Sequence, residues 1–293
     1  MTHVAPRDLA FLLCINLIWG FNLVASKIGL EHFPPVLFTA LRFTLFGVLV
    51  MPFLRWHPGR MQRLLIAGLL SGGLCFALLF IGLARVAHAS SVAIAGQLGV
   101  PFTTLLSVLF LDEQVHWRRW LGIALAFTGV AIIGFEPGAH ADRIGLALVV
   151  ASSLIGAVGI IVVKGLSTSL RPLELQAWVA WSGMPVLYFL TFWLEDGQAM
   201  AIASATARDW ASIVFTAVAA SVIAHTGFYY LVRRYPVTSL SPLTLVSPVF
   251  GVAFSVWLLG DPLTLRIVAG GLVTLSGVLI IVLRERQMVD TGT

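Results

Sequence analysis

Long apolar stretches, separated by short polar connections, restrict what this chain can fold into. Each is about 20 residues long, the length that an α-helix needs to cross the hydrocarbon core of a bilayer. Ten such stretches would use roughly 200 of the 293 residues, which leaves no room for a separate soluble domain. Only 11% of the residues are charged and 59% are hydrophobic, a composition that nearly excludes a soluble globular protein.

The sequence therefore predicts an all-α membrane protein with ten transmembrane helices. The expected spans are Leu9–Ile28, Pro35–Leu54, Leu64–Ala84, Ser90–Leu111, Trp117–Phe135, Ile144–Leu166, Leu173–Leu194, Trp210–Val232, Val237–Leu259 and Leu263–Leu283. The first apolar stretch is longer than the core of a signal peptide, so we expect it to be retained.

The basic residues predict the orientation, because cytoplasmic connections of membrane proteins are enriched in Lys and Arg. If the N-terminus is inside, the cytoplasmic connections hold Arg7, Arg55, Arg60, Arg63, Arg118, Arg119, Arg171, Arg233, Arg234, Arg284 and Arg286. The opposite connections then hold only Arg85, Arg143, Arg208 and Arg266. Both termini are therefore expected in the cytoplasm, and the net charge of +5 predicts topology rather than nucleic-acid binding.

The two halves of the sequence resemble each other. Lys27 and Lys164 are 137 residues apart, and so are Pro35 and Pro172. Farther along, the separation becomes 148 residues, as between Gly122 and Gly270 or Gly129 and Gly277. We expect residues 1–138 and 139–293 to form two five-helix repeats. Because five is odd, the second repeat must enter the membrane from the opposite side, which gives the inverted repeats typical of transporters.

Several motifs resemble the EamA family of the drug/metabolite transporter superfamily. They are Trp19–Gly20–Phe21–Asn22 with Ser26–Lys27, Leu41–Arg42–Phe43, and the acidic turns Leu111–Asp112–Glu113 and Leu259–Gly260–Asp261, each followed by a Gly-rich helix. The resemblance covers nearly the whole chain and is strongest to the amino-acid exporters of the family. One departure is that the fourth span reads Gly99–Val100–Pro101 and lacks the Ser-Pro pair that the ninth span keeps as Ser247–Pro248.

Two prolines are candidate hinges beside a substrate cavity. Pro101 and Pro248 occupy near-corresponding places in the fourth and ninth spans, and interrupted helices at matching positions point to a midplane site. Gln97 shares a helical face with Pro101, and Thr244 shares one with Pro248. Close packing of small residues is the alternative explanation for both faces.

Other candidate cavity residues lie on four further spans. Asn16, Trp19 and Asn22 form a polar stripe on the first span, where amides need partners inside the bundle. Ser152 belongs to a groove of small residues on the sixth span, which provides room for a solute or seats another helix. The aromatic candidates are Phe80 and Phe228, which correspond at the separation of 148 residues.

Few charged or titratable side chains lie within the spans. Lys27, Arg42 and Lys164 either extend to the membrane interface or act as counter-ions for a solute carboxylate. His225 shares a face with Ser221 and Tyr229, and either relays a proton or only makes a hydrogen bond inside the bundle. No carboxylate lies near the middle of a span, so we expect facilitative transport rather than strong ion coupling.

The sequence contains no catalytic motif, no Cys/His cluster and no phosphate-binding loop, so we expect no enzyme, no cofactor and no metal. The expected function is export of small amphipathic metabolites, most of all neutral and aromatic amino acids as the resemblance implies, by alternating access in a bacterial inner membrane. The expected partners are the solute and membrane lipid, with no nucleic acid, and the expected oligomeric state is a monomer. The alternative is an exporter of drugs or sugar-type metabolites, with proton coupling.

Overall fold

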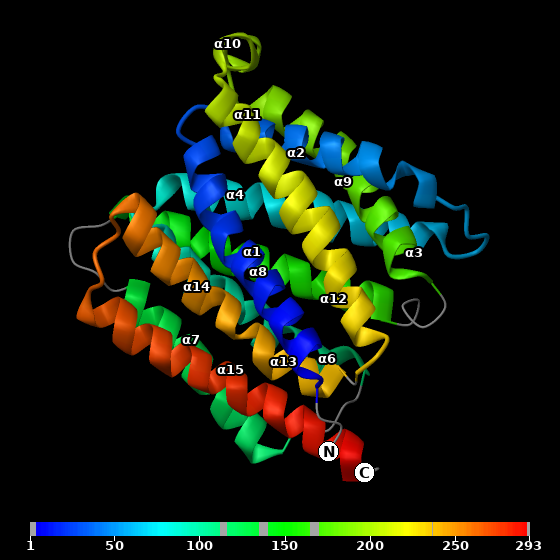
Figure 1. Cartoon of the computed structure of the whole chain (residues 1–293), viewed down its shortest axis with the longest axis vertical. Helices are drawn as coiled ribbons and strands as arrows, with labels where there is room; N and C mark the ends of the chain where they lie inside the picture. The colour runs from blue at the N-terminus through cyan, green and yellow to red at the C-terminus, as the bar shows by residue number, and fades with distance from the viewer. Residues whose placement is uncertain (1–3, 112–115, 135–139, 165–169, 236, 292–293) are drawn as a thin grey trace.

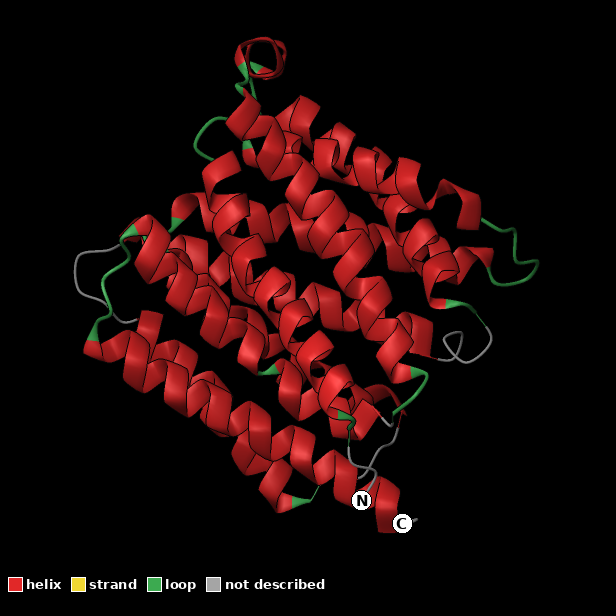
Figure 2. Cartoon of the chain, in the orientation of Figure 1, coloured by secondary structure: helices red, strands yellow, loops and turns green. Residues whose placement is uncertain are grey.

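The structure is a computed structural model that describes residues 4–111, 116–134, 140–164, 170–235 and 237–291. In these ranges the chain consists of helices joined by loops and turns, with no β-strand (Figure 2). The predicted all-α class is therefore confirmed for the described part of the chain. The expected boundary between residues 138 and 139, the acidic pair Asp112–Glu113, and the expected span ends Phe135 and Leu166 lie outside these ranges.

Figure 1 shows the helices as a slanted bundle. In chain order they are α1 (Pro6–Gly29), α2 (Pro35–Val50), η1 (Met51–Phe53), α3 (Met61–Ala67), η2 (Gly68–Leu74), α4 (Cys75–Arg85), α5 (Ala89–Ala95), η3 (Gly96–Leu98), α6 (Gly99–Leu111), α7 (Trp117–Gly134), α8 (His140–Lys164), α9 (Pro172–Leu194), α10 (Gln198–Ser204), α11 (Ala207–Val214), η4 (Phe215–Ala224), α12 (His225–Val232), α13 (Val237–Thr244), α14 (Val246–Phe254), η5 (Ser255–Leu259) and α15 (Leu265–Thr291).

Nine helical segments of the described chain are long and apolar enough to cross a membrane. They are Pro6–Gly29, Pro35–Phe53, Met61–Arg85, Ala89–Phe110, Asp142–Val163, Pro172–Leu194, Ala207–Val232, Leu240–Leu259 and Leu265–Leu283. Each overlaps one of the ten expected spans. The expected span at Trp117–Phe135 corresponds to α7, which is outside this set although it has 18 residues. Arg118 and Arg119 near its start lower its mean hydropathy.

Large apolar side chains are exposed on the outside of the bundle. Phe192, Trp193 and Trp257 are 75%, 68% and 76% exposed, and Leu265 is 83% exposed. In water such a surface would favour aggregation, whereas lipid chains solvate it. The exposed surface is therefore that of a membrane protein.

Several spans are not continuous α-helices. The segments η2 and η4 are π-helical, and they interrupt the third and eighth spans. A shift of 148 residues places η2 over residues 216–222, inside η4. Single π-helical turns are frequent at functional sites because they redirect side chains and free carbonyl groups. These two interruptions position part of the cavity described below.

The helices α7 and α15 pack side by side along one edge of the bundle (Figure 1). Their backbones touch at two glycine pairs, Gly122 with Gly277 and Gly129 with Gly270. The pairs are reciprocal, because Gly122 corresponds to Gly270 and Gly129 to Gly277 at the separation of 148 residues. A side chain at any of the four would meet the opposite helix, so glycine is required for this close approach.

Candidate functional site

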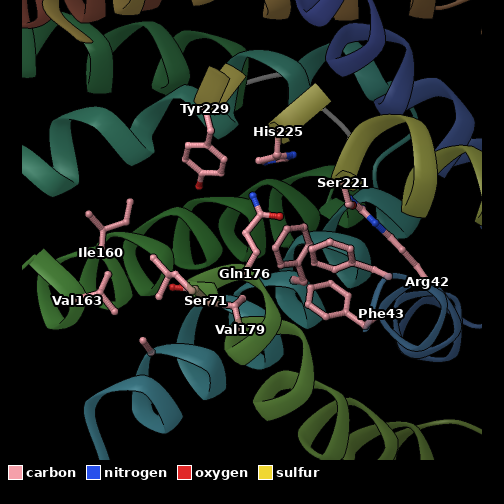
Figure 3. A pocket seen from close by; sticks show the side chains of 14 residues that line it. Arg42, Phe43, Ser71, Ile160, Val163, Gln176, Val179, Ser221, His225 and Tyr229 are labelled. Atoms are coloured by element: carbon pink, nitrogen blue, oxygen red, sulfur yellow. The ribbon is translucent and has the colours of Figure 1, made fainter. Parts of the chain in front are cut away.

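A cavity of about 330 Å³ lies among α2, the third span, α8, α9 and the eighth span (Figure 3). Its volume is within the range of small-molecule sites, about 300–1,000 Å³. The lining residues are Arg42, Phe43, Phe46, Ala67, Ser71, Phe76, Ile160, Val163, Leu175, Gln176, Val179, Ser221, His225 and Tyr229. Most are apolar, and a few polar groups face the same space, so the cavity matches an amphipathic solute.

Arg42 supplies the charge in the cavity wall. It is only 4% exposed, and its Nη2 donates a hydrogen bond to Ser221 Oγ at 3.0 Å. Its guanidinium carbon lies 5.3 Å from the ring centre of Phe76 and 5.6 Å from that of Phe80, which allows cation–π stabilisation. Its Nε and Nη1 are buried and make no hydrogen bond within the described residues. The site thus presents a buried positive charge with unused donors.

Carbonyl groups of the π-helical segment η4 hold two polar side chains of the cavity lining, Ser221 and His225. Ser221 Oγ donates to the carbonyl of Thr216 at 2.9 Å, and His225 Nδ1 lies 2.7 Å from the carbonyl of Ala220. Both partners are five residues earlier, the same separation as in the backbone hydrogen bonds of a π-helix. Because a carbonyl only accepts, this geometry assigns the hydrogen to Nδ1, and Nε2 of the neutral imidazole is an acceptor.

Gln176 projects into the cavity from α9 (Figure 3). Its Nε2 is buried and has no hydrogen-bond partner among the described residues. Ser71, from η2, and Tyr229, from α12, add hydroxyl groups to the same space. A solute in this cavity can therefore exchange hydrogen bonds with an amide, an imidazole and hydroxyl groups.

A second cavity, of about 750 Å³, shares Tyr229 with the first. It is lined by residues from the ends of α9 and α12 and by Phe53, and includes Arg171 and Arg233. These two arginines lie in connections that the sequence analysis assigns to the cytoplasm. The second cavity is therefore a candidate route between the first cavity and that side of the membrane.

The structure brings three of the predicted site residues together. His225 lines the cavity, and the ring of Trp19 lies 5.2 Å from that of His225 and 5.5 Å from that of Phe228. Asn16 is buried, and its Nδ2 donates to the carbonyl of Leu12. The side-chain oxygens of Asn16 and Asn22 and the indole nitrogen of Trp19 are buried without partners in the described chain.

Two predicted residues pack beside the cavity. Phe80 is 2% exposed and lies beneath Arg42, 6.2 Å from the ring of Phe76. Ser152 donates a hydrogen bond to the carbonyl of Cys75, so it joins α8 to α4. Neither side chain is part of the cavity lining.

The remaining predicted residues lie at interruptions in the fourth and ninth spans. Gln97 lies in the 3-10 turn η3, four residues before Pro101, and Thr244 ends α13, four residues before Pro248. Proline has no N–H and cannot bond the carbonyl four residues earlier, which accounts for breaks at these places. Gln97 and Thr244 do not line either cavity described above.

The sequence predicts a cavity among the first, third, fourth, sixth, eighth and ninth spans. The cavity described above instead includes the second and seventh spans, through Arg42, Phe43 and Gln176. The sequence leaves Arg42 as either a residue that reaches the interface or a counter-ion, and Gln176 is not among the predicted site residues. The signal for Gln176 is an uncharged polar side chain in a long apolar segment.

Lys27 has a structural partner. Its Nζ donates to the carbonyls of Leu83, at 2.8 Å, and Val86, so it caps the last turn of α4. The side chain of Lys164 lies outside the described residues. No group of three or more potential metal ligands occurs in the described part of the chain.

Comparison with known proteins identifies relatives along the whole chain. An Escherichia coli K12 protein named "Probable amino-acid metabolite efflux pump" is 30% identical over 300 residues, which cover 99% of this chain and 100% of that protein. A Salmonella typhimurium protein of the same name is 29% identical and covers 94% of this chain and 95% of its own length. A "Probable terminal-alkyne amino-acid exporter" of Streptantibioticus cattleyicolor is 32% identical over 61% of this chain and 59% of its own.

A solved protein crystal structure aligns with 97% of this chain and 99% of its own, with a TM-score of 0.66 and 15% identity, which supports a common fold alone. The model of the EamA-like transporter family matches residues 8–135 and again residues 143–283. These two matches cover most of the sequence. The chain therefore belongs to the EamA-like transporter family of the drug/metabolite transporter superfamily, and it is a multi-pass membrane transporter rather than an enzyme.

Proposed function

We propose that this transporter exports small amphipathic metabolites, most of all neutral and aromatic amino acids, across a bacterial inner membrane. The observation that carries the proposal is the cavity in which Arg42, Gln176, Ser221 and His225 face apolar and aromatic side chains. Such a site matches a solute with a polar end and an apolar side chain. The names of the relatives from Escherichia coli and Salmonella typhimurium favour amino-acid metabolites.

Transport is facilitative and proceeds by alternating access in this proposal. The described lining of the two cavities contains no Asp or Glu, so neither offers the intramembrane carboxylate that strong proton or sodium coupling uses. The π-helical segments η2 and η4 and the breaks before Pro101 and Pro248 give several spans a place to bend. Motion of the two halves about these places would expose the cavity to one side at a time.

The proposed architecture is ten spans in two inverted repeats, residues 1–138 and 139–293, with both termini in the cytoplasm. The reciprocal glycine pairs of α7 and α15 support a pseudo-two-fold relation, because each contact has its counterpart at the same residue separation. The corresponding positions of η2 and η4 agree with it. Helix α1 begins and helix α15 ends at the same end of the bundle (Figure 1), as an even number of spans requires. The proposed transport unit is a monomer.

Counterflow in sealed liposomes tests the function. Purified protein is reconstituted in liposomes loaded with unlabelled L-phenylalanine or L-leucine, and entry of the labelled amino acid is followed with and without an imposed pH gradient. We expect saturable entry that the gradient does not change. Entry that follows the gradient would indicate proton coupling through His225 and contradict facilitative transport. Absence of flux for every amino acid tested would favour a drug or sugar-type solute.

A further inference from the structure

We propose that the cavity selects its solute by a carboxylate, held at Arg42, and that a solute amino group contributes little to binding. The substrate class would then be organic carboxylates with an apolar or aromatic side chain, of which neutral amino acids are one part. This inference rests on the proposed function and specifies the chemistry of the same cavity.

The Arg42 guanidinium is buried and only partly hydrogen-bonded. It is 4% exposed, lines the cavity, and has no ion pair with any described acidic residue. One nitrogen bonds Ser221, while Nε and Nη1 have no partner in the described chain. An isolated buried cation with unused donors is costly, and a carboxylate supplies both the opposite charge and the acceptors. Arginine also binds carboxylates more directionally than lysine does.

The charged residues that line the two cavities are all basic. Arg42 is the charged residue among those that line the first cavity, and Arg171 and Arg233 are the charged residues that line the second. Neither described lining contains an acidic residue, although Glu174 lies 4.0 Å from Arg171 and partly offsets its charge. A basic path attracts anions and repels cations, so an amine without a carboxylate is disfavoured throughout.

The amino group of a bound solute meets no negative charge in the cavity lining. The side-chain acceptors of the cavity lining are uncharged, namely the amide oxygen of Gln176, the hydroxyls of Ser71 and Tyr229, and Nε2 of His225 in its neutral form. A neutral acceptor can bond an ammonium group but does not neutralise its charge. The ammonium charge also loses its water shell on entering a lining without an acidic residue, and this cost offsets the hydrogen bonds that the group gains, so loss of the amino group should change affinity little.

The first test uses the wild-type protein and three probes with the same aromatic side chain. Purified protein binds labelled L-phenylalanine, and unlabelled 3-phenylpropionate or 2-phenylethylamine is added as a competitor. We expect 3-phenylpropionate to displace the label within about tenfold of the concentration needed for L-phenylalanine itself, and 2-phenylethylamine not to displace it. Competition by the amine as effective as that by the acid would overturn the inference and leave amino-acid transport intact. If no probe binds, both the inference and the proposed function are overturned.

The second test replaces the guanidinium. Loss of one charge-assisted hydrogen bond predicts roughly 10- to 150-fold weaker binding of 3-phenylpropionate in Arg42→Met. Arg63→Gln removes an exposed positive charge outside both cavities, and we expect wild-type binding. Unchanged binding in Arg42→Met would contradict the inference.

Folding of the variant is measured separately. Arg42→Met should unfold at the wild-type temperature or above, because methionine removes buried donors without partners and Ser221 keeps its bond to the Thr216 carbonyl. If Arg42→Met does not fold, Arg42→Lys replaces it as the test variant. It keeps the positive charge, and its less directional donors should weaken the binding of both acids, L-phenylalanine and 3-phenylpropionate. Wild-type affinity of Arg42→Lys for both acids would then count against the inference.

Discussion

The substitution Gly270→Ala tests the reciprocal contact between α7 and α15. A Cβ atom at position 270 would lie 2.6 Å from the carbonyl oxygen of Gly129 and 2.6 Å from Cγ1 of Ile133. Both distances are about 1 Å shorter than an optimal non-bonded contact. Because one of the two atoms belongs to the backbone, a change of rotamer cannot relieve the clash, and the helices must separate.

The expected loss of stability follows from two opposing effects. Overpacking of a tight contact costs about 1–3 kcal/mol, and replacing a helical glycine by alanine returns about 0.5–1 kcal/mol. The net destabilisation of Gly270→Ala is then about 1–2 kcal/mol. Gly99→Ala is the matched control, since no heavy atom would lie within 4 Å of its Cβ, and it should be neutral or stabilising by up to about 1 kcal/mol.

The measurement is the free energy of unfolding of the purified protein in mixed micelles, followed by circular dichroism as the denaturing detergent increases. We expect Gly270→Ala to be less stable than Gly99→Ala by about 2 kcal/mol. If Gly270→Ala is as stable as Gly99→Ala, the close approach of α7 and α15 is wrong, and the reasoning from the glycine pairs fails with it.

Three further predictions concern two hydrogen-bonded side chains and the membrane topology. Glu195 accepts hydrogen bonds from two backbone N–H groups at the start of α2, at 2.7 and 2.9 Å. Glu195→Ala should therefore destabilise the protein by about 1–2 kcal/mol in the same assay, whereas Asp196→Ala, at an exposed position, should not. Lys27→Met removes the donor that caps the C-terminal carbonyls of α4 and should cost about 1–3 kcal/mol, whereas equal stability would show that the cap is dispensable. For the proposed topology, an impermeant maleimide added to intact cells should label Asp196→Cys and not Arg60→Cys in a background without Cys14 and Cys75; the reverse pattern would invert the topology.

The spans were predictable because a transmembrane helix depends mainly on a sustained run of apolar residues. The window Ser90–Leu111, for example, differs by one residue from the segment that begins at Ala89 and ends at Leu111. The interruptions within the spans were harder to predict. A π-helical turn such as η2 inserts one residue into the helical register, and its stability depends on packing against other helices rather than on a local residue type.

The site was predictable only where its residues share one helix. Ser221, His225 and Tyr229 are four residues apart, and the structure places all three in one cavity lining. Which other helices face them depends on how the spans assemble, and helix periodicity does not contain that information. Arg42 therefore stayed between two explanations, and Gln176 on α9 was not considered.

Solute protection of a cysteine in the cavity tests the central claim most directly. Ser71 lies in the cavity lining, and Ser71→Cys in a background without Cys14 and Cys75 replaces one small side chain by another. A thiol reagent should modify this cysteine in the reconstituted protein, and saturating L-phenylalanine should slow the modification severalfold, while L-phenylalanine should not slow the modification of Asp196→Cys. Equal rates of Ser71→Cys modification with and without L-phenylalanine, in liposomes that show counterflow, would contradict the assignment of this cavity as the transport site.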